Sequence, residues 1–138
     1  MSEETVQGTD AWKQARLGRV TASRVADVVA KTRTGWGASR ANYMAQLVAE
    51  RLTGEQAETY SNAAMAWGLE KEPEARAAYE FRTDVDVVKC GFIDHPNLNM
   101  TGASPDGFVG DDGLLEIKCP NTANHIETLK GRAVPSKY

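Results

Sequence analysis

Two short segments, Ser104-Pro105-Asp106 and Glu116-Ile117-Lys118, have the residue types and spacing best suited to chemistry in this chain. Between them lies Asp111-Asp112-Gly113, a strong signal for a hairpin turn. A hairpin at this point would place Asp106 at the end of one strand, next to Glu116 on the following strand. Because side chains alternate along a strand, Lys118 is expected on the same face as Glu116.

The chemistry that such a group would support is metal-assisted hydrolysis. Two carboxylates beside the Ile117 carbonyl are hard oxygen ligands, which suit Mg²⁺, with Mn²⁺ as a substitute. A bound divalent ion activates a water molecule and stabilises charge on a phosphoryl oxygen. Lys118 could orient or deprotonate that water, or neutralise the developing negative charge.

A structural interpretation of the same residues stays open. Asp106-Gly107 is also a turn signal, and Glu116 and Lys118 also fit a pair of surface charges on a strand. By residue frequencies alone, the pattern arises by chance in roughly one to three per cent of chains of this length. The two segments by themselves therefore do not decide between a metal site and an ordinary hairpin.

The elements that must position these residues divide into a helical first part and a strand-rich second part. We expect a helix over 11–17, capped by Asp10 and stopped at Gly18, and a second over 21–30, opened by Thr21 or Ser23. A loop is expected over 32–37. A helix should then run from a Ser39 cap to Gly54, with an apolar stripe of Met44, Leu47, Val48 and Leu52. A further helix is expected over 62–81, with a kink or restart at Pro73.

The residue pattern changes after Phe81 from one typical of helices to one typical of strands. Strands are expected over 85–90, 100–104, 107–109 and 114–118, followed by a helix over 121–129. In the last strand, Leu115 and Ile117 should share one face and Glu116 and Lys118 the other. Helices followed by a meander of strands indicate a single domain over residues 1–138 of mixed α/β (α+β) class.

Composition and charge exclude several classes of protein. The 138 residues hold no apolar run long enough to span a membrane and no secretory signal at the start. Two cysteines exclude a disulfide framework, and with two histidines at no tight ligand spacing they argue against structural zinc.

Residues 11–40 carry seven basic groups against one acidic group, whereas residues 50–112 carry thirteen acidic against five basic. This asymmetry suits an anion site beside a metal site, and it equally suits two solvated faces.

Several further motifs occur in a fixed order along nearly the whole chain. They are Asp10-Ala11-Trp12, Arg16-Leu17-Gly18, Thr21-Ala22-Ser23, Ala66-Trp67-Gly68 with Glu72, Thr101 to Gly107, and Leu115 to Pro120. With these motifs the chain resembles the phage lambda exonuclease, or YqaJ-like viral recombinase, family of the PD-(D/E)xK nuclease superfamily. An ordered set of motifs is far more specific than the two segments alone.

The resemblance implies a role for individual residues. Asp106 and Glu116 would be metal ligands together with the Ile117 carbonyl, and Lys118 would be the catalytic lysine. Glu72 would be an additional acidic residue of the metal centre; its other interpretation is an ordinary exposed helix glutamate. Arg16, with Thr21 and Ser23, would hold the 5′-phosphate of the degraded strand; the structural alternatives are a helix-dipole charge and a helix cap.

The resemblance also implies a fold and an activity. The fold would be a restriction-endonuclease-like core with a mixed central sheet flanked by helices. The activity would be a Mg²⁺-dependent 5′-to-3′ exonuclease on double-stranded DNA ends, leaving 3′ single-stranded overhangs for phage-type recombination. A single-strand annealing protein would be the partner, and a phage- or prophage-encoded protein in the bacterial cytoplasm the setting.

Three further expectations complete the interpretation. Family members continue with more helix and strand, so the chain is expected to be truncated at its C-terminus relative to the family, as a natural remnant or as a partial fragment. A ring-shaped homotrimer would require that part. The alternatives are a non-catalytic remnant that binds DNA ends, and a related endonuclease or junction resolvase with the same metal centre.

Overall fold

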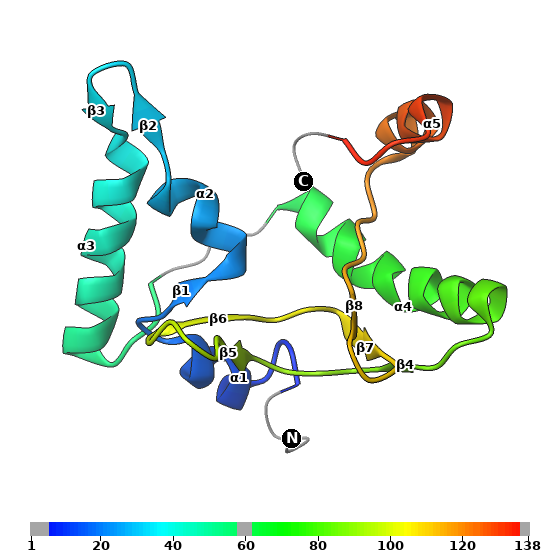
Figure 1. Ribbon diagram of the computed structural model, residues 1–138, viewed down its shortest axis with the longest axis horizontal. Helices are drawn as coiled ribbons and strands as arrows, with labels where there is room; N and C mark the ends of the chain where they lie inside the picture. Colours follow the sequence, from blue (N-terminus) through cyan, green and yellow to red (C-terminus); the bar gives the residue numbers. More distant parts are fainter. Residues whose placement is uncertain (1–5, 58–61, 136–138) are drawn as a thin grey trace.

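The fold consists of helices and short strands in the computed structural model (Figure 1), which describes residues 6–57 and 62–135. The first part contains α1 (Asp10–Arg16), β1 (Val20–Thr21), the 3₁₀ turn η2 (Ala22–Arg24), α2 (Val25–Val28), β2 (Lys31–Thr32), β3 (Gly35–Trp36) and α3 (Ala38–Thr53). The second part contains α4 (Ala63–Thr83), β4 (Val87–Val88), β5 (Ile93–Asp94), β6 (Thr101–Ala103), β7 (Gly107–Val109), β8 (Gly113–Leu115) and α5 (Thr122–Gly131). The expected mixed α/β class is confirmed.

Two small sheets form the layer that connects the helices. The first has the order β1-β6-β5, with β1 parallel to β6 and β5 antiparallel to it. The second has the order β4-β7-β8 and is antiparallel throughout. In Figure 1 both lie low in the view, with α3 rising on one side and α4 on the other. Since β6 leads directly into β7, the residues between them lie where one sheet passes into the next.

The helices begin and end at residues that differ in part from those expected. Thr9, not Asp10, caps α1, because its hydroxyl accepts the Trp12 N–H at 3.2 Å. Gly37 occupies the N-cap of α3, so Ser39 lies inside the first turn and does not cap it. Gly54 ends α3 as expected, at a φ of 72° that favours glycine. Asn62 and Asn121 cap α4 and α5 through their side-chain oxygens.

Two expectations for local structure are wrong, and one of the two alternatives expected at Pro73 is excluded. The predicted helix over 21–30 is divided into β1, η2 and α2, because Val20 and Thr21 pair with β6 instead of joining a helix. The predicted loop over 32–37 is the β2–β3 hairpin, two residues long on each side. At Pro73, where a kink or a restart is predicted, the restart does not occur, since α4 runs through the proline; a proline removes one backbone N–H, and the remaining hydrogen bonds of a 21-residue helix compensate.

The buried stripe of α3 also differs from the apolar pattern of its sequence. Tyr43, Leu47 and Glu50 are buried, whereas Met44, Val48 and Leu52 are exposed. The helix turns this way because Tyr43 and Glu50 hydrogen-bond to backbone groups of the β1 region. Polar contacts therefore determine which face of α3 packs inward.

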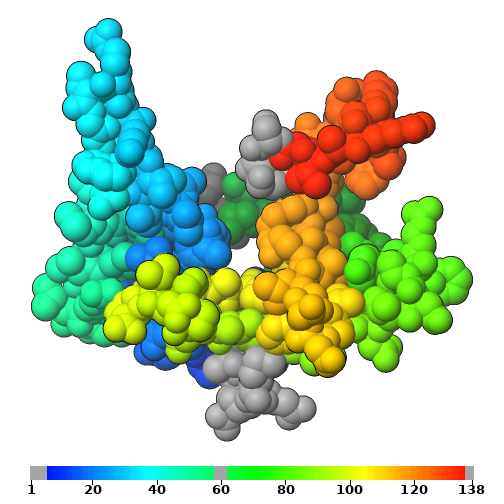
Figure 2. Space-filling model, in the orientation of Figure 1, coloured from blue at the N-terminus to red at the C-terminus, as the bar shows by residue number. Residues whose placement is uncertain are grey.

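Burial in the described residues is sparse and partly polar. The buried hydrophobic residues are Tyr43, Leu47 and Cys90, and the buried polar or charged ones are Thr21, Glu50, Arg76 and Asp106. In the described part of the chain, no helix is both long and apolar enough to cross a membrane. Figure 2 shows the surface hollowed between the side formed by α2, the β2–β3 hairpin and α3 and the side formed by α5 and the residues after β8. Burying a charged group costs free energy unless the group is paired, so the buried ionisable residues indicate candidate functional sites.

Candidate functional site

Asp106 lies between β6 and β7 and is held against the segment that follows β8. Its backbone N–H donates to the Leu115 carbonyl at 3.0 Å, and its Oδ2 accepts the Ile117 N–H at 2.5 Å. These two bonds bracket Glu116, so the β7–β8 hairpin brings Asp106 beside the Glu116–Lys118 segment, as the turn signal indicated. The Asp106 side chain is itself buried, at 9% exposure.

Glu116 and Lys118 share an exposed face next to Asp106. The ladder of β8 ends at Leu115, so both residues follow the strand and do not belong to it, contrary to the predicted strand over 114–118. The expected alternation persists nevertheless, with Leu115 and Ile117 partly covered and Glu116 and Lys118 exposed. The Lys118 ammonium donates to Glu116 Oε1. The acid and the lysine therefore lie within reach of each other on the accessible side of the hairpin.

Glu72 approaches Asp106 from α4. A pocket of about 130 Å³ is lined by Glu72, Arg76, Cys90 and Asp106 among others. Arg76 joins the two acidic residues, because its Nη2 donates to Glu72 Oε1 at 2.5 Å and to the Asp106 carbonyl at 3.2 Å. The Glu72 side chain is 24% exposed, which differs from the ordinary exposed glutamate of the structural alternative.

The donors in this pocket suit an oxygen-liganded divalent ion. Within residues 6–57 and 62–135, no three acidic, histidine or cysteine side chains converge on one point as a preformed metal cluster. Mg²⁺, however, commonly takes one or two carboxylates and completes its shell with water and substrate phosphate. Glu72 and Asp106 on one pocket wall meet that requirement, whereas the Glu116 carboxylate contacts Lys118 in this structure.

Arg16 sits on a second, separate group of contacts at the end of α1. Its guanidinium lies over the Trp12 ring, 4.1 Å from the ring centroid, and Trp12 Nε1 donates to Ser104 Oγ at 2.9 Å. The buried Arg16 Nε has no hydrogen-bond partner among the described residues. Burial lowers the pKa of Arg16, and the nearby Tyr43 and Glu50 partly offset this. Arg16 is therefore a half-desolvated cation with unused donor capacity, which suits an anionic ligand.

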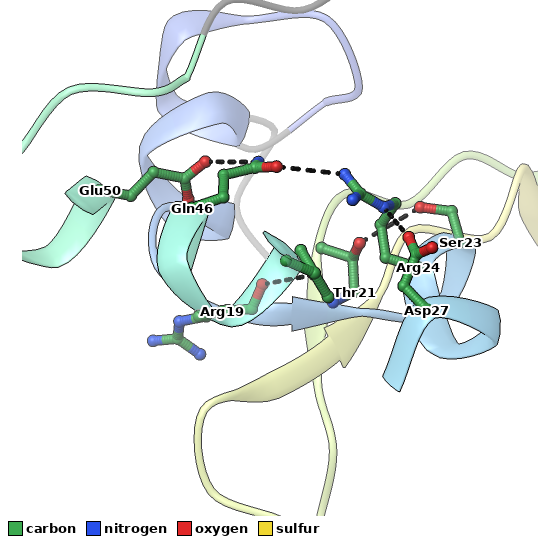
Figure 3. A network of polar contacts seen from close by, with 8 residues as sticks. Arg19, Thr21, Ser23, Arg24, Asp27, Gln46 and Glu50 are labelled. Atoms are coloured by element: carbon green, nitrogen blue, oxygen red, sulfur yellow. Dashed lines mark hydrogen bonds and ion pairs between the residues drawn. The ribbon is translucent and has the colours of Figure 1, made fainter. Parts of the chain in front are cut away.

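Thr21 and Ser23 lie together where β1 passes into η2 (Figure 3). Their hydroxyl oxygens are 3.2 Å apart, and the Thr21 N–H donates to the Tyr43 hydroxyl at 3.1 Å. Tyr43 in turn donates to the Arg19 carbonyl. The structure thus brings Thr21 and Ser23 into one polar group, and Tyr43 borders both this group and Arg16.

Sequence reasoning did not single out the buried charges Glu50 and Arg76. Glu50 accepts hydrogen bonds from the Gly18 N–H and from Gln46 Nε2, both at 2.9 Å. Glu50 has helical spacing from Tyr43 and Leu47, so the three lie on one face of the helix. A search for the inward face that allowed polar residues would have identified Glu50. Arg76 follows Glu72 by four residues, and this spacing was the available signal for a helix ion pair.

The pKa values of the two cysteine thiols depend on the charged residues around Glu72 and Asp106. Burial raises the pKa of the Cys90 thiol, the charge of Asp106 raises it further, and the charge of Arg76 partly offsets both. Burial likewise raises the pKa of Cys119, with added contributions from Glu72 and Asp106. The charges that act on Cys119 are all negative, whereas Cys90 lies between a negative and a positive charge in a pocket that Lys89 also lines.

Comparisons with known proteins identify a family and similar structures. Residues 11–138 match the YqaJ-like viral recombinase domain. The structure is similar to LHK-Exo in complex with dAMP, with a TM-score of 0.82 and 56% identity, and to an alkaline exonuclease (LHK-Exo) from Laribacter hongkongensis, with a TM-score of 0.81 and 55% identity. Each match covers 94% of this chain, and the chain spans 63% of the length of those proteins. No curated protein is significantly similar to it.

Proposed function

This chain belongs to the YqaJ-like viral recombinase domain family, and from that premise we propose that it is a Mg²⁺-dependent nuclease that degrades one strand of duplex DNA from its 5′ end. The observation that carries the proposal is the pair of hydrogen bonds from Asp106 to Leu115 and Ile117, the residues on either side of Glu116. They occur in a chain that is 56% identical to LHK-Exo. The crystal complex of LHK-Exo with dAMP supports it further, because a nucleoside monophosphate is what exonucleolytic cleavage releases.

In this proposal Glu72, Asp106, Glu116 and the Ile117 carbonyl supply the oxygen ligands of the ion. When bound, Mg²⁺ would lower the pKa of a coordinated water and neutralise charge on the scissile phosphate. Lys118, on the face of Glu116, would hold the attacking water or the phosphoryl oxygen. Mn²⁺ has the same preference for oxygen ligands and would substitute for Mg²⁺.

The contacts around Arg16, Thr21 and Ser23 would determine the direction of digestion. We assign the 5′-phosphate to Arg16, with Thr21 and Ser23 as hydroxyl donors. The stacked Arg16 guanidinium is restrained by the Trp12 ring, so little side-chain freedom is lost when a phosphate binds. Digestion from that end would leave a 3′ single-stranded overhang, the substrate of a single-strand annealing protein, in the bacterial cytoplasm where phage DNA recombines.

The test is a cleavage assay on linear duplexes with a 5′-phosphate or a 5′-hydroxyl and on closed circular duplex, each with Mg²⁺ or EDTA. We expect Mg²⁺-dependent release of mononucleotides from linear DNA, faster with the 5′-phosphate. Cutting of closed circles would instead identify an endonuclease or resolvase. Salt-sensitive binding to ends without Mg²⁺-dependent turnover would identify a non-catalytic remnant.

A further inference from the structure

Arg76 is a buried cation between the two acidic residues that approach each other from α4 and from the β6–β7 connection. Its side chain is 9% exposed, and its Nη2 bonds to Glu72 Oε1 and to the Asp106 carbonyl. It also lines the pocket that contains both acidic residues. An arginine in this position belongs to neither the metal ligands nor the phosphate contacts assigned above.

The contacts of Arg76 are more specific than those of an ordinary helix ion pair. An exposed pair four residues apart contributes little and leaves its partners free to move. Here one nitrogen contacts the carboxylate of Glu72 and the main chain of Asp106, so helix and hairpin are joined at a single atom. The buried Arg76 Nε finds no hydrogen-bond acceptor among the described residues, which is a cost that an apolar residue would not carry.

From these contacts we propose that Arg76 is a positioning residue for the divalent ion: it fixes the Glu72 carboxylate through Oε1 at the pocket that Asp106 also lines. This rests on the proposed function of the pocket as a metal site. Residues that orient metal ligands from outside the coordination shell typically change metal affinity by about tenfold to a hundredfold.

The alternative role of Arg76 is that of a simple counter-charge, and it predicts the opposite change. A guanidinium beside the carboxylates competes with an incoming cation, so its removal would strengthen metal binding. If Arg76 positions Glu72, its removal weakens metal binding despite the more negative pocket. The sign of the change therefore distinguishes the two roles.

The experiment measures Mg²⁺ binding to the full chain without DNA by isothermal titration calorimetry. The variants are Arg76→Met, Arg76→Lys and, as a matched control, Arg82→Met, an exposed arginine of the same helix. We expect both Arg76 variants to bind Mg²⁺ about tenfold or more weakly, since lysine cannot reproduce the guanidinium geometry. Arg82→Met should match the wild-type protein, and circular dichroism confirms which variants are folded.

Dependence on Glu72 is tested by combining Arg76→Met with Glu72→Gln. If Arg76 acts through Glu72, the second substitution adds little to the loss of Mg²⁺ affinity already caused by the first. Independent, additive losses would overturn the proposal, as would unchanged or tighter Mg²⁺ binding in a folded Arg76 variant. Unfolding of both Arg76→Met and Arg76→Lys would also overturn it, in favour of a purely structural role. A wild-type chain that neither binds Mg²⁺ nor cleaves DNA would instead refute the proposed function.

Discussion

Replacing Asp106 by asparagine and by alanine separates a role in chemistry from a role in folding. Asp106 is buried, its Oδ2 accepts the Ile117 N–H at 2.5 Å, and its backbone N–H donates to the Leu115 carbonyl. Asparagine keeps the shape of the side chain and one acceptor oxygen, whereas alanine removes the acceptor altogether. Both variants keep the backbone bond to Leu115, so both should fold.

The structure sets the expected size of the two effects on stability. A hydrogen bond to a charged group contributes about 1.5–3 kcal/mol to the free energy of unfolding, and a neutral one about 0.5–1.5 kcal/mol. Asp106→Ala should therefore lower that free energy by about 1.5–3 kcal/mol, or about 5–10 °C in Tm for a chain of this size. Asp106→Asn should lower it by about 1 kcal/mol, the difference between the charged and the neutral bond.

Cleavage should behave differently from stability. Each variant removes a charged ligand of the ion, so both should fall to the level of the EDTA control on a 5′-phosphorylated linear duplex. Mg²⁺ at a hundred times its Kd stabilises a folded protein by about 2.7 kcal/mol, so the wild-type Tm should rise with Mg²⁺ and that of both variants should not. Asp111→Asn, in the turn of the same hairpin, is the matched control. Near wild-type cleavage by folded Asp106→Asn, or a retained Mg²⁺-dependent rise in its Tm, would refute the assignment.

Three further outcomes test the rest of the interpretation. Arg16→Ala should shrink the preference for 5′-phosphorylated over 5′-hydroxyl ends by about tenfold to a hundredfold, the equivalent of 1.5–3 kcal/mol, and equal slowing of both ends would assign Arg16 to the helix dipole. Arg33 is exposed in the turn between β2 and β3, so Arg33→Ala should weaken binding to both ends alike and lower the salt slope by about one unit; an unchanged slope excludes a phosphate contact. Because its pKa is raised, Cys119 should react with iodoacetamide more slowly than free cysteine at about pH 8, and Asp106→Asn should speed the reaction; a fast wild-type thiol contradicts the negative potential.

The hairpin between Asp106 and Glu116 could be predicted because its signals are local. Asp111-Asp112-Gly113 specifies the turn, and β7 pairs with β8 around it in register. The period of two then assigns Leu115 and Ile117 to one face and Glu116 and Lys118 to the other, even though the ladder ends at Leu115. A turn, an alternation and a short loop are enough to bring two carboxylate-bearing segments together.

Contacts between distant segments could not be predicted in this way. Thr21 looked like a helix start, but its backbone pairs with β6, about eighty residues later. The apolar spacing of α3 indicated Met44 and Leu52 as inward residues, yet both are exposed. The face that packs inward is decided by Glu50 and Tyr43, whose partners lie on other elements, and a pattern of apolar residues carries no information about polar partners.

A side-chain hydrogen bond, in addition to the pairing of β1 with β6, links the two groups of residues that the proposed reaction needs. Trp12 Nε1 donates to Ser104 Oγ, while the Trp12 ring lies under Arg16 and Ser104 precedes Asp106 by two residues. An enzyme that starts at a phosphorylated end must hold that end at a fixed separation from its metal ion, because small displacements of reacting groups cost large factors in rate. Trp12 contacts both the residue assigned to the phosphate and the loop that carries Asp106, the proposed metal ligand. In the proposed reaction that separation would be fixed by the Trp12 side chain, which joins α1 to the residues before β7, and by the pairing of β1 with β6.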